Sequence, residues 1–253
     1  MAIFHAADAQ IHYDDLGEGD PLLVIHGAAA SGRWFDHISP ALAQRHRTII
    51  PDLRGLGRSQ RVAPLDRPEV WIKDLLGLLD HLGLDTVDVL GVSLGSRIAG
   101  RLALTAPHRV RSLIVDAPII GMSSSGSASL NTTFAATDPD GAQAREWRQL
   151  HGEDWADVVA FYAKTRSTPA FQSYFTLEPQ LAEITAPTLI CRGDHDDPIH
   201  PLANAFDWYR GAPNTALWIA PGLTQSSTVL ERPEAFVEAL AYFELHQRST
   251  LAA

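Results

Sequence analysis

The chain has 253 residues, of which 45% are hydrophobic and 20% charged, and its formal net charge is -10. This length suits one large domain, or a domain with a modest insertion, of ordinary globular composition. The acidic balance argues against nucleic acid or an anionic membrane as the main partner, and the lone cysteine, Cys191, excludes an internal disulfide.

No targeting or membrane-spanning segment is expected. Residues 1–15 lack a basic segment followed by an apolar run, so no signal peptide is predicted. No uncharged apolar stretch approaches about 18 residues, which a helical membrane span requires. A cytoplasmic location is the default expectation.

In chain order, the first expected element is an antiparallel hairpin at residues 4–17, on a sheet edge. Short runs rich in Val, Ile and Leu follow, as expected of strands buried on both faces, at residues 21–27, 47–55, 86–93, 111–118, 187–194 and 215–222. Helical patterns lie between them at residues 33–45, 69–82, 94–106, 201–209 and 233–246. This alternation predicts an α/β protein with a mostly parallel sheet flanked by helices.

The alternation breaks between residues 119 and 184. Residues 121–131, GMSSSGSASLN, are rich in Ser and Gly and predict a flexible crossing, whereas residues 144–164 have helical spacing. We interpret residues 119–184 as a small helical cap inserted into an α/β core formed by residues 1–118 and 185–253. Two ordinary surface helices are the alternative interpretation.

The first chemical motif is G-x-S-x-G at residues 91–95, between an expected strand and an expected helix. In that context the serine, Ser93, sits in a strained turn that exposes its hydroxyl, and the N–H of Leu94 faces a developing oxyanion. A second donor is expected from the N–H of Ala28, after His26-Gly27, with His26 orienting the loop. A turn that simply requires small residues is the alternative.

A glycine-rich turn, DLRGLGRS, covers residues 52–59 and is interpreted as structural. Its Asp52 and Arg54 could form an internal ion pair.

Taken in order, His26-Gly27 and residues 52–59, 91–96, 193–198 and 230–236 resemble the α/β-hydrolase superfamily over nearly the whole chain. The resemblance implies an enzyme with a catalytic serine, acid and histidine in that chain order. It assigns the nucleophile to Ser93 and the acid to Asp196, with Asp116 as an alternative position. The small cap resembles that of enol-lactonases and small-molecule esterases.

One residue departs from the family pattern. Alignment on residues 230–236, LERPEAF, puts Gln225 where the family has its histidine. A primary amide does not titrate near neutral pH, so it cannot act as the general base that a serine nucleophile needs. The sequence therefore predicts a degenerate catalytic triad.

Three functions remain open. The favoured one is non-hydrolytic chemistry, such as decarboxylation, a lyase step, cyclisation or isomerisation. In it, Ser93 and Gln225 hold a carbonyl while the amides of Ala28 and Leu94 stabilise an enolate. The second is ester or lactone hydrolysis, with His195 or His200 as a relocated base or with Gln225 as an engineered substitution. The third is ligand binding without turnover.

The expected partner is a small, apolar carbonyl compound, such as an ester, a lactone or a β-keto acid. Cap aromatics could line its pocket or form the cap core: Trp147, Trp155, Phe161 and Tyr174. No metal site and no cofactor motif are predicted, since a turn as short as residues 195–197 gives poor chelating geometry. The sequence does not indicate an oligomeric state.

Overall fold

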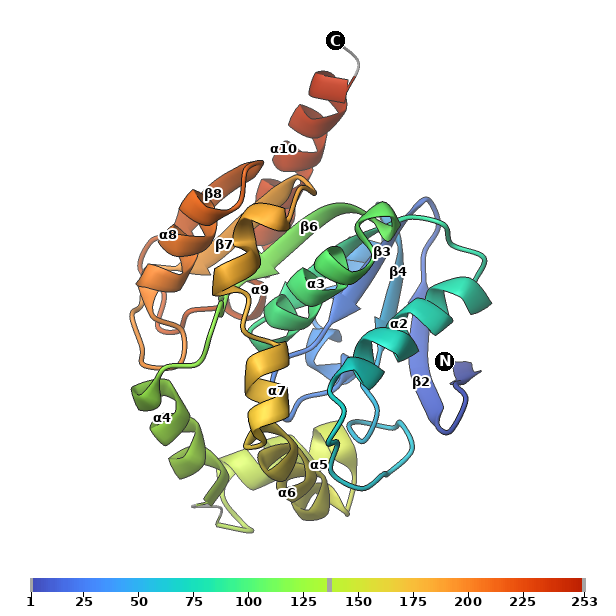
Figure 1. Ribbon diagram of the computed structural model, residues 1–253, viewed down its shortest axis with the longest axis vertical. Helices are drawn as coiled ribbons and strands as arrows, with labels where there is room; N and C mark the ends of the chain where they lie inside the picture. The colour runs from blue at the N-terminus through green and yellow to red at the C-terminus, as the bar shows by residue number, and fades with distance from the viewer. Residues whose placement is uncertain (1, 136–137, 252–253) are drawn as a thin grey trace.

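The computed structural model describes residues 2–135 and 138–251. Its centre is an eight-stranded sheet in the order β1-β2-β4-β3-β5-β6-β7-β8 (Figure 1). The strands are β1 (Ala2–His5), β2 (Gln10–Leu16), β3 (Asp20–Ile25), β4 (His46–Pro51), β5 (Val87–Val92), β6 (Val110–Asp116), β7 (Thr188–Gly193) and β8 (Thr215–Ala220). β1 and β2 form the expected edge hairpin, β2 pairs antiparallel with β4, and the remaining pairings are parallel. The predicted α/β architecture is confirmed.

Both faces of the sheet are buried. Leu23 and Ile25 contribute to one hydrophobic core, whereas Leu22 and Val24 contribute to the other, because successive side chains of a strand point to opposite faces. Helices α2 (Glu69–His81), α3 (Leu94–Thr105) and α8 (Leu202–Gly211) bury residues in the first core. Helices α1 (Ser39–Ala43), α9 (Thr228–Glu231) and α10 (Pro233–Leu251) bury residues in the second.

Two expected helices are interrupted. The run 33–45 is a 3₁₀ turn, η1 (Gly32–Phe35), followed by α1, which has a proline in its first turn, where proline favours a new helix start. The run 144–164 is divided by Gly152, whose φ of 95° ends α5 (Ala142–His151) before α6 (Trp155–Arg166).

The flexible crossing expected at residues 121–131 is wrong, because most of it belongs to helix α4 (Ser124–Ala135). The hydroxyl of Ser123 accepts the N–H of Gly126 at 3.0 Å, which satisfies a donor at the helix start. Arg166 of α6 also donates to the carbonyl of Ser127 and the side chain of Asn131. Tertiary contacts therefore stabilise a helix that composition alone does not favour.

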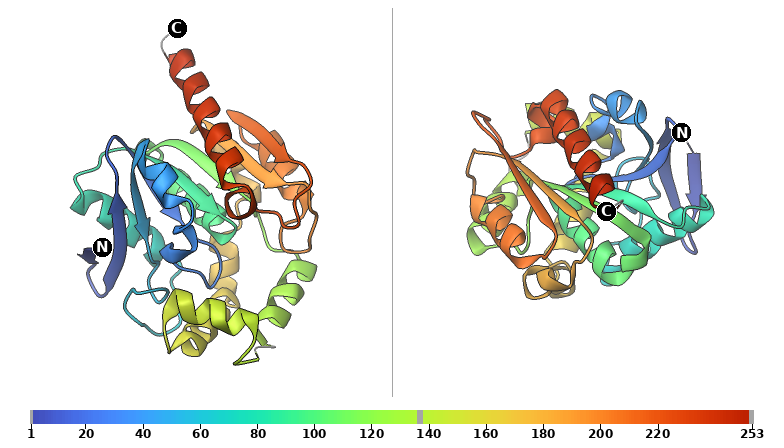
Figure 2. Two further views of the ribbon diagram at one scale, coloured as in Figure 1. Left: turned by 180° about the vertical axis from the view of Figure 1, so that it is seen from behind. Right: turned by 90° about the horizontal axis from the view of Figure 1, so that it is seen from above.

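The α4–α7 segment, which includes α7 (Pro169–Tyr174), lies in the chain between β6 and β7. It gathers at the end of the molecule away from the projecting C-terminal part of α10 (Figures 1 and 2). A further 3₁₀ turn, η3 (Glu178–Glu183), leads back to the sheet. Among the described helices, none combines the length and apolar character that crossing a bilayer requires.

Candidate active site

Ser93 lies at a sharp turn between β5 and α3. Its φ of 56° and ψ of -117° are strained values for a residue other than glycine. A Cβ atom at Gly91 would lie 2.2 Å from the carbonyl oxygen of Gly95, and one at Gly95 would lie 2.1 Å from that of Ile25. Both positions therefore require glycine, and the predicted steric basis of the G-x-S-x-G motif is present.

A histidine ring contacts the Ser93 hydroxyl. Nε2 of His200, in the loop between β7 and α8, lies 2.8 Å from Oγ of Ser93. Nδ1 of the same ring lies 3.4 Å from Oδ2 of Asp197. With the ring proton on Nδ1, His200 accepts the Ser93 hydroxyl and donates toward Asp197, which is the relation of base, nucleophile and acid in serine hydrolases.

The structure therefore differs from the favoured prediction of a site without a base, because an imidazole contacts the Ser93 hydroxyl. Of the two substitute bases considered, His200 makes the contact. His195 is exposed, and no hydrogen bond joins its ring to another described residue.

The acidic partner of His200 is Asp197, whereas sequence reasoning assigned the acid to Asp196. Oδ1 of Asp197 accepts the backbone N–H groups of Ile199 and His200, each at 2.9 Å. Burial opposes ionisation of Asp197, but hydrogen bonds from His200 and Ser226 hold its pKa well below the usual range. Asp196 instead accepts the N–H of Leu202 at 2.6 Å, at the start of α8.

Gln225 lines a cavity of about 370 Å³ together with Ser93 and His200. It is exposed, and its backbone N–H donates to Glu231 at 2.9 Å. No hydrogen bond joins Gln225 to Ser93 among the described residues. Gln225 therefore borders the site without a hydrogen bond to the nucleophile.

Asp116, the alternative acid, is fully buried at the end of β6. It accepts the hydroxyls of Ser227 and Thr228 and the N–H groups of Thr228 and Val229, so it anchors the start of α9. Burial raises the pKa of Asp116, and these hydrogen bonds oppose that rise.

A buried arginine organises the loop that contains His200. Arg192 of β7 donates from Nη1 to the carbonyl of His200 at 2.9 Å and from Nε to that of Gly193 at 2.6 Å, and it also reaches the carbonyl of His195. Sequence analysis did not single out this residue. The available signal was one charge within the apolar run Thr188–Gly193.

The two candidate oxyanion donors, the amides of Ala28 and Leu94, border one enclosed cavity of about 70 Å³ with Ser93 and His200. Neither amide has a hydrogen-bond acceptor among the residues that the structure describes. His26 is buried, accepts the N–H of Leu53 at 3.1 Å, and contacts the carbonyl of Gly27 at 2.9 Å. Burial lowers the pKa of His26, so it orients this loop as a neutral ring, in the structural role predicted for it.

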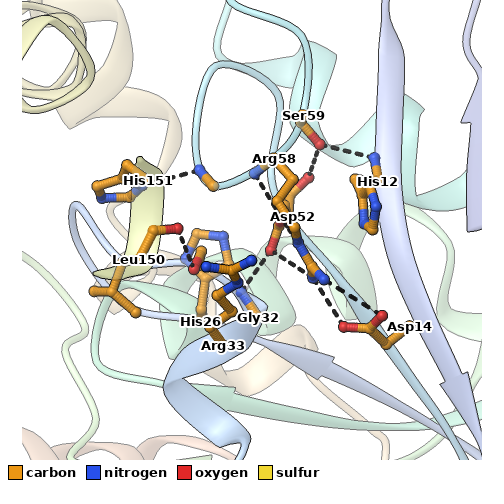
Figure 3. A network of polar contacts seen from close by, with 12 residues as sticks. His12, Asp14, His26, Gly32, Arg33, Asp52, Arg58, Ser59, Leu150 and His151 are labelled. Atoms are coloured by element: carbon orange, nitrogen blue, oxygen red, sulfur yellow. Dashed lines mark hydrogen bonds and ion pairs between the residues drawn. The ribbon is translucent and has the colours of Figure 1, made fainter. Parts of the chain in front are cut away.

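The turn at residues 52–59 is structural, but its predicted ion pair is wrong. Asp52 pairs with Arg58 at 2.7 Å and accepts the N–H of Gly32 at 2.6 Å (Figure 3). Arg54 pairs instead with Asp74. The β3–η1 loop and the 52–59 turn therefore hold each other in place.

Hydrogen bonds join helix α5 to both the β3–η1 loop and the 52–59 turn (Figure 3). Nδ1 of His151 accepts the N–H of Gly57 at 3.0 Å, and its Nε2 donates to the carbonyl of Ala29 at 2.9 Å. The hydroxyl of Ser31 donates to the carbonyl of Leu150 at 3.0 Å. Burial lowers the pKa of His151 to about 4, so the ring is neutral at physiological pH.

The four aromatic residues expected at the pocket differ in position. Trp147 borders a cavity of about 240 Å³ beside Ala28. Trp155 stacks on Trp147, with ring centroids 5.8 Å apart, and Phe161 packs closely against Gly55. Tyr174 packs against Arg101. Two pocket residues that sequence analysis missed, Arg97 and Tyr162, border the enclosed cavity.

One His/Asp/Glu cluster within the described ranges has ligand atoms within 4.8 Å of one another: His46, Asp88 and Glu244. His46 and Asp88 lie at the starts of β4 and β5, the opposite end of the sheet from Ser93. Both carboxylate oxygens of Asp88 already accept hydrogen bonds from Arg111. A guanidinium in that position competes with a metal ion, so the cluster fits an ion-pair network better.

Comparison with known proteins identifies the family of this chain. Residues 20–145 match a family model described as the alpha/beta hydrolase fold. The chain is 31% identical over 247 residues to a 2-hydroxy-6-oxononadienedioate/2-hydroxy-6-oxononatrienedioate hydrolase of Pseudomonas putida, covering 84% of each chain. It is 28% identical to a 2-hydroxymuconate semialdehyde hydrolase of the same species, covering 94% of this chain and 92% of that one.

Among solved structures, an N-acyl homoserine lactone degrading enzyme superposes with a TM-score of 0.76 at 25% identity, covering 96% of this chain and 100% of that one. A hydrolase from Pseudomonas aeruginosa superposes with a TM-score of 0.74 at 23% identity, covering 96% and 97%. The chain therefore belongs to the α/β-hydrolase family.

Proposed function

We propose that this protein is a serine hydrolase of small esters or lactones, with Ser93 as nucleophile, His200 as general base and Asp197 as the acid that orients the base. The observation that carries the proposal is the 2.8 Å contact between Ser93 Oγ and His200 Nε2. It removes the physical reason for favouring non-hydrolytic chemistry, which was the lack of a proton acceptor.

In the first half-reaction, His200 Nε2 takes the Ser93 proton as Oγ attacks the substrate carbonyl. The amides of Ala28 and Leu94 stabilise the oxyanion, and Asp197 stabilises the imidazolium. Collapse of the intermediate breaks the bond to the leaving group, which takes the proton from His200. Water, deprotonated by the same ring, then cleaves the acyl-enzyme and regenerates the serine.

The sheet order supports a base delivered from the loop after β7. Ser93 follows β5, and β6 separates β5 from β7 by a single strand. The carboxyl ends of these parallel strands meet at one edge, so the β7–α8 loop needs to cross only the end of β6. The loop after β8, which contains Gln225, starts one strand farther away.

Two cavities meet at the nucleophile. Ser93 and His200 border both the cavity of about 370 Å³ and the enclosed cavity of about 70 Å³. We assign the enclosed cavity, which contains both candidate oxyanion amides, to the acyl group, and the larger one to the leaving group. We also propose that the α4–α7 segment acts as a cap over this site, consistent with the residues Leu130 and Tyr162 that it contributes to the enclosed cavity.

The test is hydrolysis of p-nitrophenyl acetate by the unmodified protein and by the variants Ser93→Ala and His200→Gln, with His195→Gln as the matched histidine control. The proposal expects turnover in the unmodified protein and in His195→Gln, and its near-complete loss in the other two. Labelling by a fluorophosphonate should follow the same pattern. Equal turnover in Ser93→Ala, or none in the unmodified protein, would contradict the assignment and favour binding without turnover.

A further inference from the structure

Arg97 is a buried cation beside the proposed nucleophile. It lies one turn after Ser93 on α3 and is only 2% exposed. It borders the enclosed cavity of about 70 Å³ together with Ser93, His200 and the candidate oxyanion residues. A group bound in that cavity would therefore lie near both Ser93 and this side chain.

The protein gives Arg97 only neutral partners. Its Nε donates to the carbonyl of Phe175 at 2.6 Å and its Nη2 to that of Gln172 at 3.4 Å, and its guanidinium lies 5.9 Å from the Phe171 ring centroid. Within residues 2–135 and 138–251, no carboxylate forms an ion pair with it. A buried charge without a counter-ion is costly, which calls for a compensating role.

Arg97 stays charged at neutral pH. Burial lowers its pKa to about 10, and the nearby cations of Arg101 and Arg166 act in the same direction. Its neighbour Tyr162 is also buried, and burial raises the pKa of that phenol to about 12. Tyr162 therefore remains a neutral hydroxyl that can donate a hydrogen bond into the same cavity.

Two side chains that border the cavity, Arg97 and Tyr162, each have a donor without a protein acceptor. Nη1 of Arg97 and the hydroxyl of Tyr162 have no hydrogen-bond partner among the described residues. Nε of Arg101 and Nε of Arg166 also lack a partner, but those two atoms are fully buried, whereas the two donors keep some accessible surface. A guanidinium and a phenol hydroxyl that border one cavity suit the oxygens of a carboxylate. The small volume leaves room only for a short arm between that group and the scissile carbonyl.

From these observations we propose that Arg97 and Tyr162 form a carboxylate subsite, so that the preferred substrates are esters or lactones whose acyl part carries a carboxylate a few bonds from the reacting carbonyl. This inference rests on the proposed hydrolase function and specifies its substrate class. Arg97 is then a specificity-determining residue that binds the acyl group.

Arg101 provides the matched control, because it lies one turn farther along α3 and also joins this helix to the segment after β6. Its Nη1 donates to Gln180 at 2.8 Å and its Nη2 to the carbonyl of Thr176 at 3.1 Å. Unlike Arg97, it is absent from the lining of the enclosed cavity. If Arg97 only holds the helix in place, substitution of Arg97 and of Arg101 should have similar effects. If Arg97 binds the substrate carboxylate, only its substitution should change the preference for an anionic substrate.

The experiment compares two esters with one leaving group, p-nitrophenyl butyrate and the mono-p-nitrophenyl ester of succinic acid. In the unmodified protein we expect kcat/KM to be about 10- to 100-fold higher for the anionic ester, mainly through a lower KM, as a charged hydrogen bond implies. Arg97→Met should abolish that preference, Arg97→Lys should keep part of it, and Arg101→Met should leave it unchanged.

The outcomes separate the two proposals. Equal kcat/KM for both esters in the unmodified protein would overturn the carboxylate subsite and leave the hydrolase function standing, and this comparison needs no variant that folds. Hydrolysis of neither ester would overturn the hydrolase function. Calorimetric binding of succinate would then decide the subsite alone: binding that Arg97→Met abolishes supports it, and no binding overturns it.

Discussion

Two loops at the same edge of the sheet differ in what they bring to Ser93. The loop 194–201, after β7, contains both His200 and Asp197, and it is held by Arg192 and by the turn at Asp197. The loop 221–227, after β8, contains Gln225 and is held by Asp194, Glu231 and Asp116. The family motif directs attention to the second loop, but the histidine that contacts the Ser93 hydroxyl is in the first.

The comparison shows that a ring nitrogen beside the Ser93 hydroxyl can come from a loop other than the one that the family motif indicates. The loop after β8 is anchored by hydrogen bonds but contains no imidazole, and a neighbouring loop places a ring beside Ser93. Since the hydroxyl requires only an acceptor within hydrogen-bond distance, either origin satisfies the chemistry.

The largest expected effect is the difference in kcat between a variant of the first loop, His200→Gln, and a variant of the second, Gln225→Ala. His200→Gln should lower kcat for p-nitrophenyl acetate by a factor on the order of 10⁴ to 10⁶, as the loss of a triad histidine does. Gln225→Ala should change it by less than about 3-fold, because no hydrogen bond joins that side chain to Ser93 among the described residues. Steady-state kinetics with matched melting temperatures provide the measurement. A loss in Gln225→Ala as large as that in His200→Gln would reverse the roles of the loops.

The next largest effect is the difference in kcat between variants of two neighbouring aspartates in the first loop, Asp197 and Asp196. Asp197→Asn should lower kcat by about 10³- to 10⁴-fold, because the ring of His200 loses the acceptor that orients it and stabilises its charge. Asp196→Asn should stay within about 3-fold, because that side chain faces the start of α8. Comparable losses in both variants would mean that this loop contributes stability rather than a specific acid.

Transfer of the imidazole between loops gives a smaller effect. The double variant His200→Gln with Gln225→His should be less than about 10-fold more active than His200→Gln alone. A histidine at position 225 would need a carboxylate to orient it, and Asp116 is already bonded to Ser227 and Thr228. Single-turnover kinetics would detect the gain. Recovery close to the unmodified rate would show that the second loop retains a working acid.

The smallest effect concerns a histidine outside both loops. His151 has a folded-state pKa of about 4, below its ordinary value of 6.5, so the unfolded chain binds the proton more tightly. Stability is therefore complete above pH 6.5 and falls as the pH drops toward 4, by up to about 3 kcal/mol.

Urea unfolding between pH 7 and pH 4 measures this dependence, with His151→Gln as the comparison. The variant should be less stable at neutral pH, because its bonds to Gly57 and Ala29 are weakened, but its stability should depend less on pH. An unchanged slope would exclude His151 as the titrating group.

The sequence by itself determined the turn that holds Ser93 and the elements around it, because these depend on local sterics. Glycines at 91 and 95 are required by close backbone contacts around one turn, and the runs of Val, Ile and Leu determine the strands on either side. The helix at residues 124–135 was missed, since its stability depends on contacts with α6 that composition does not encode.

Only the tertiary structure decided which residues face Ser93. His200 lies 107 positions away in the chain, and it reaches the hydroxyl because β6 alone separates β5 from β7 and because Arg192 holds the intervening loop. The buried charge of Arg97 is likewise visible only once the fold shows that no carboxylate within the described residues pairs with it. Distances of a few ångströms between residues far apart in sequence depend on strand order and loop path, which local patterns do not specify.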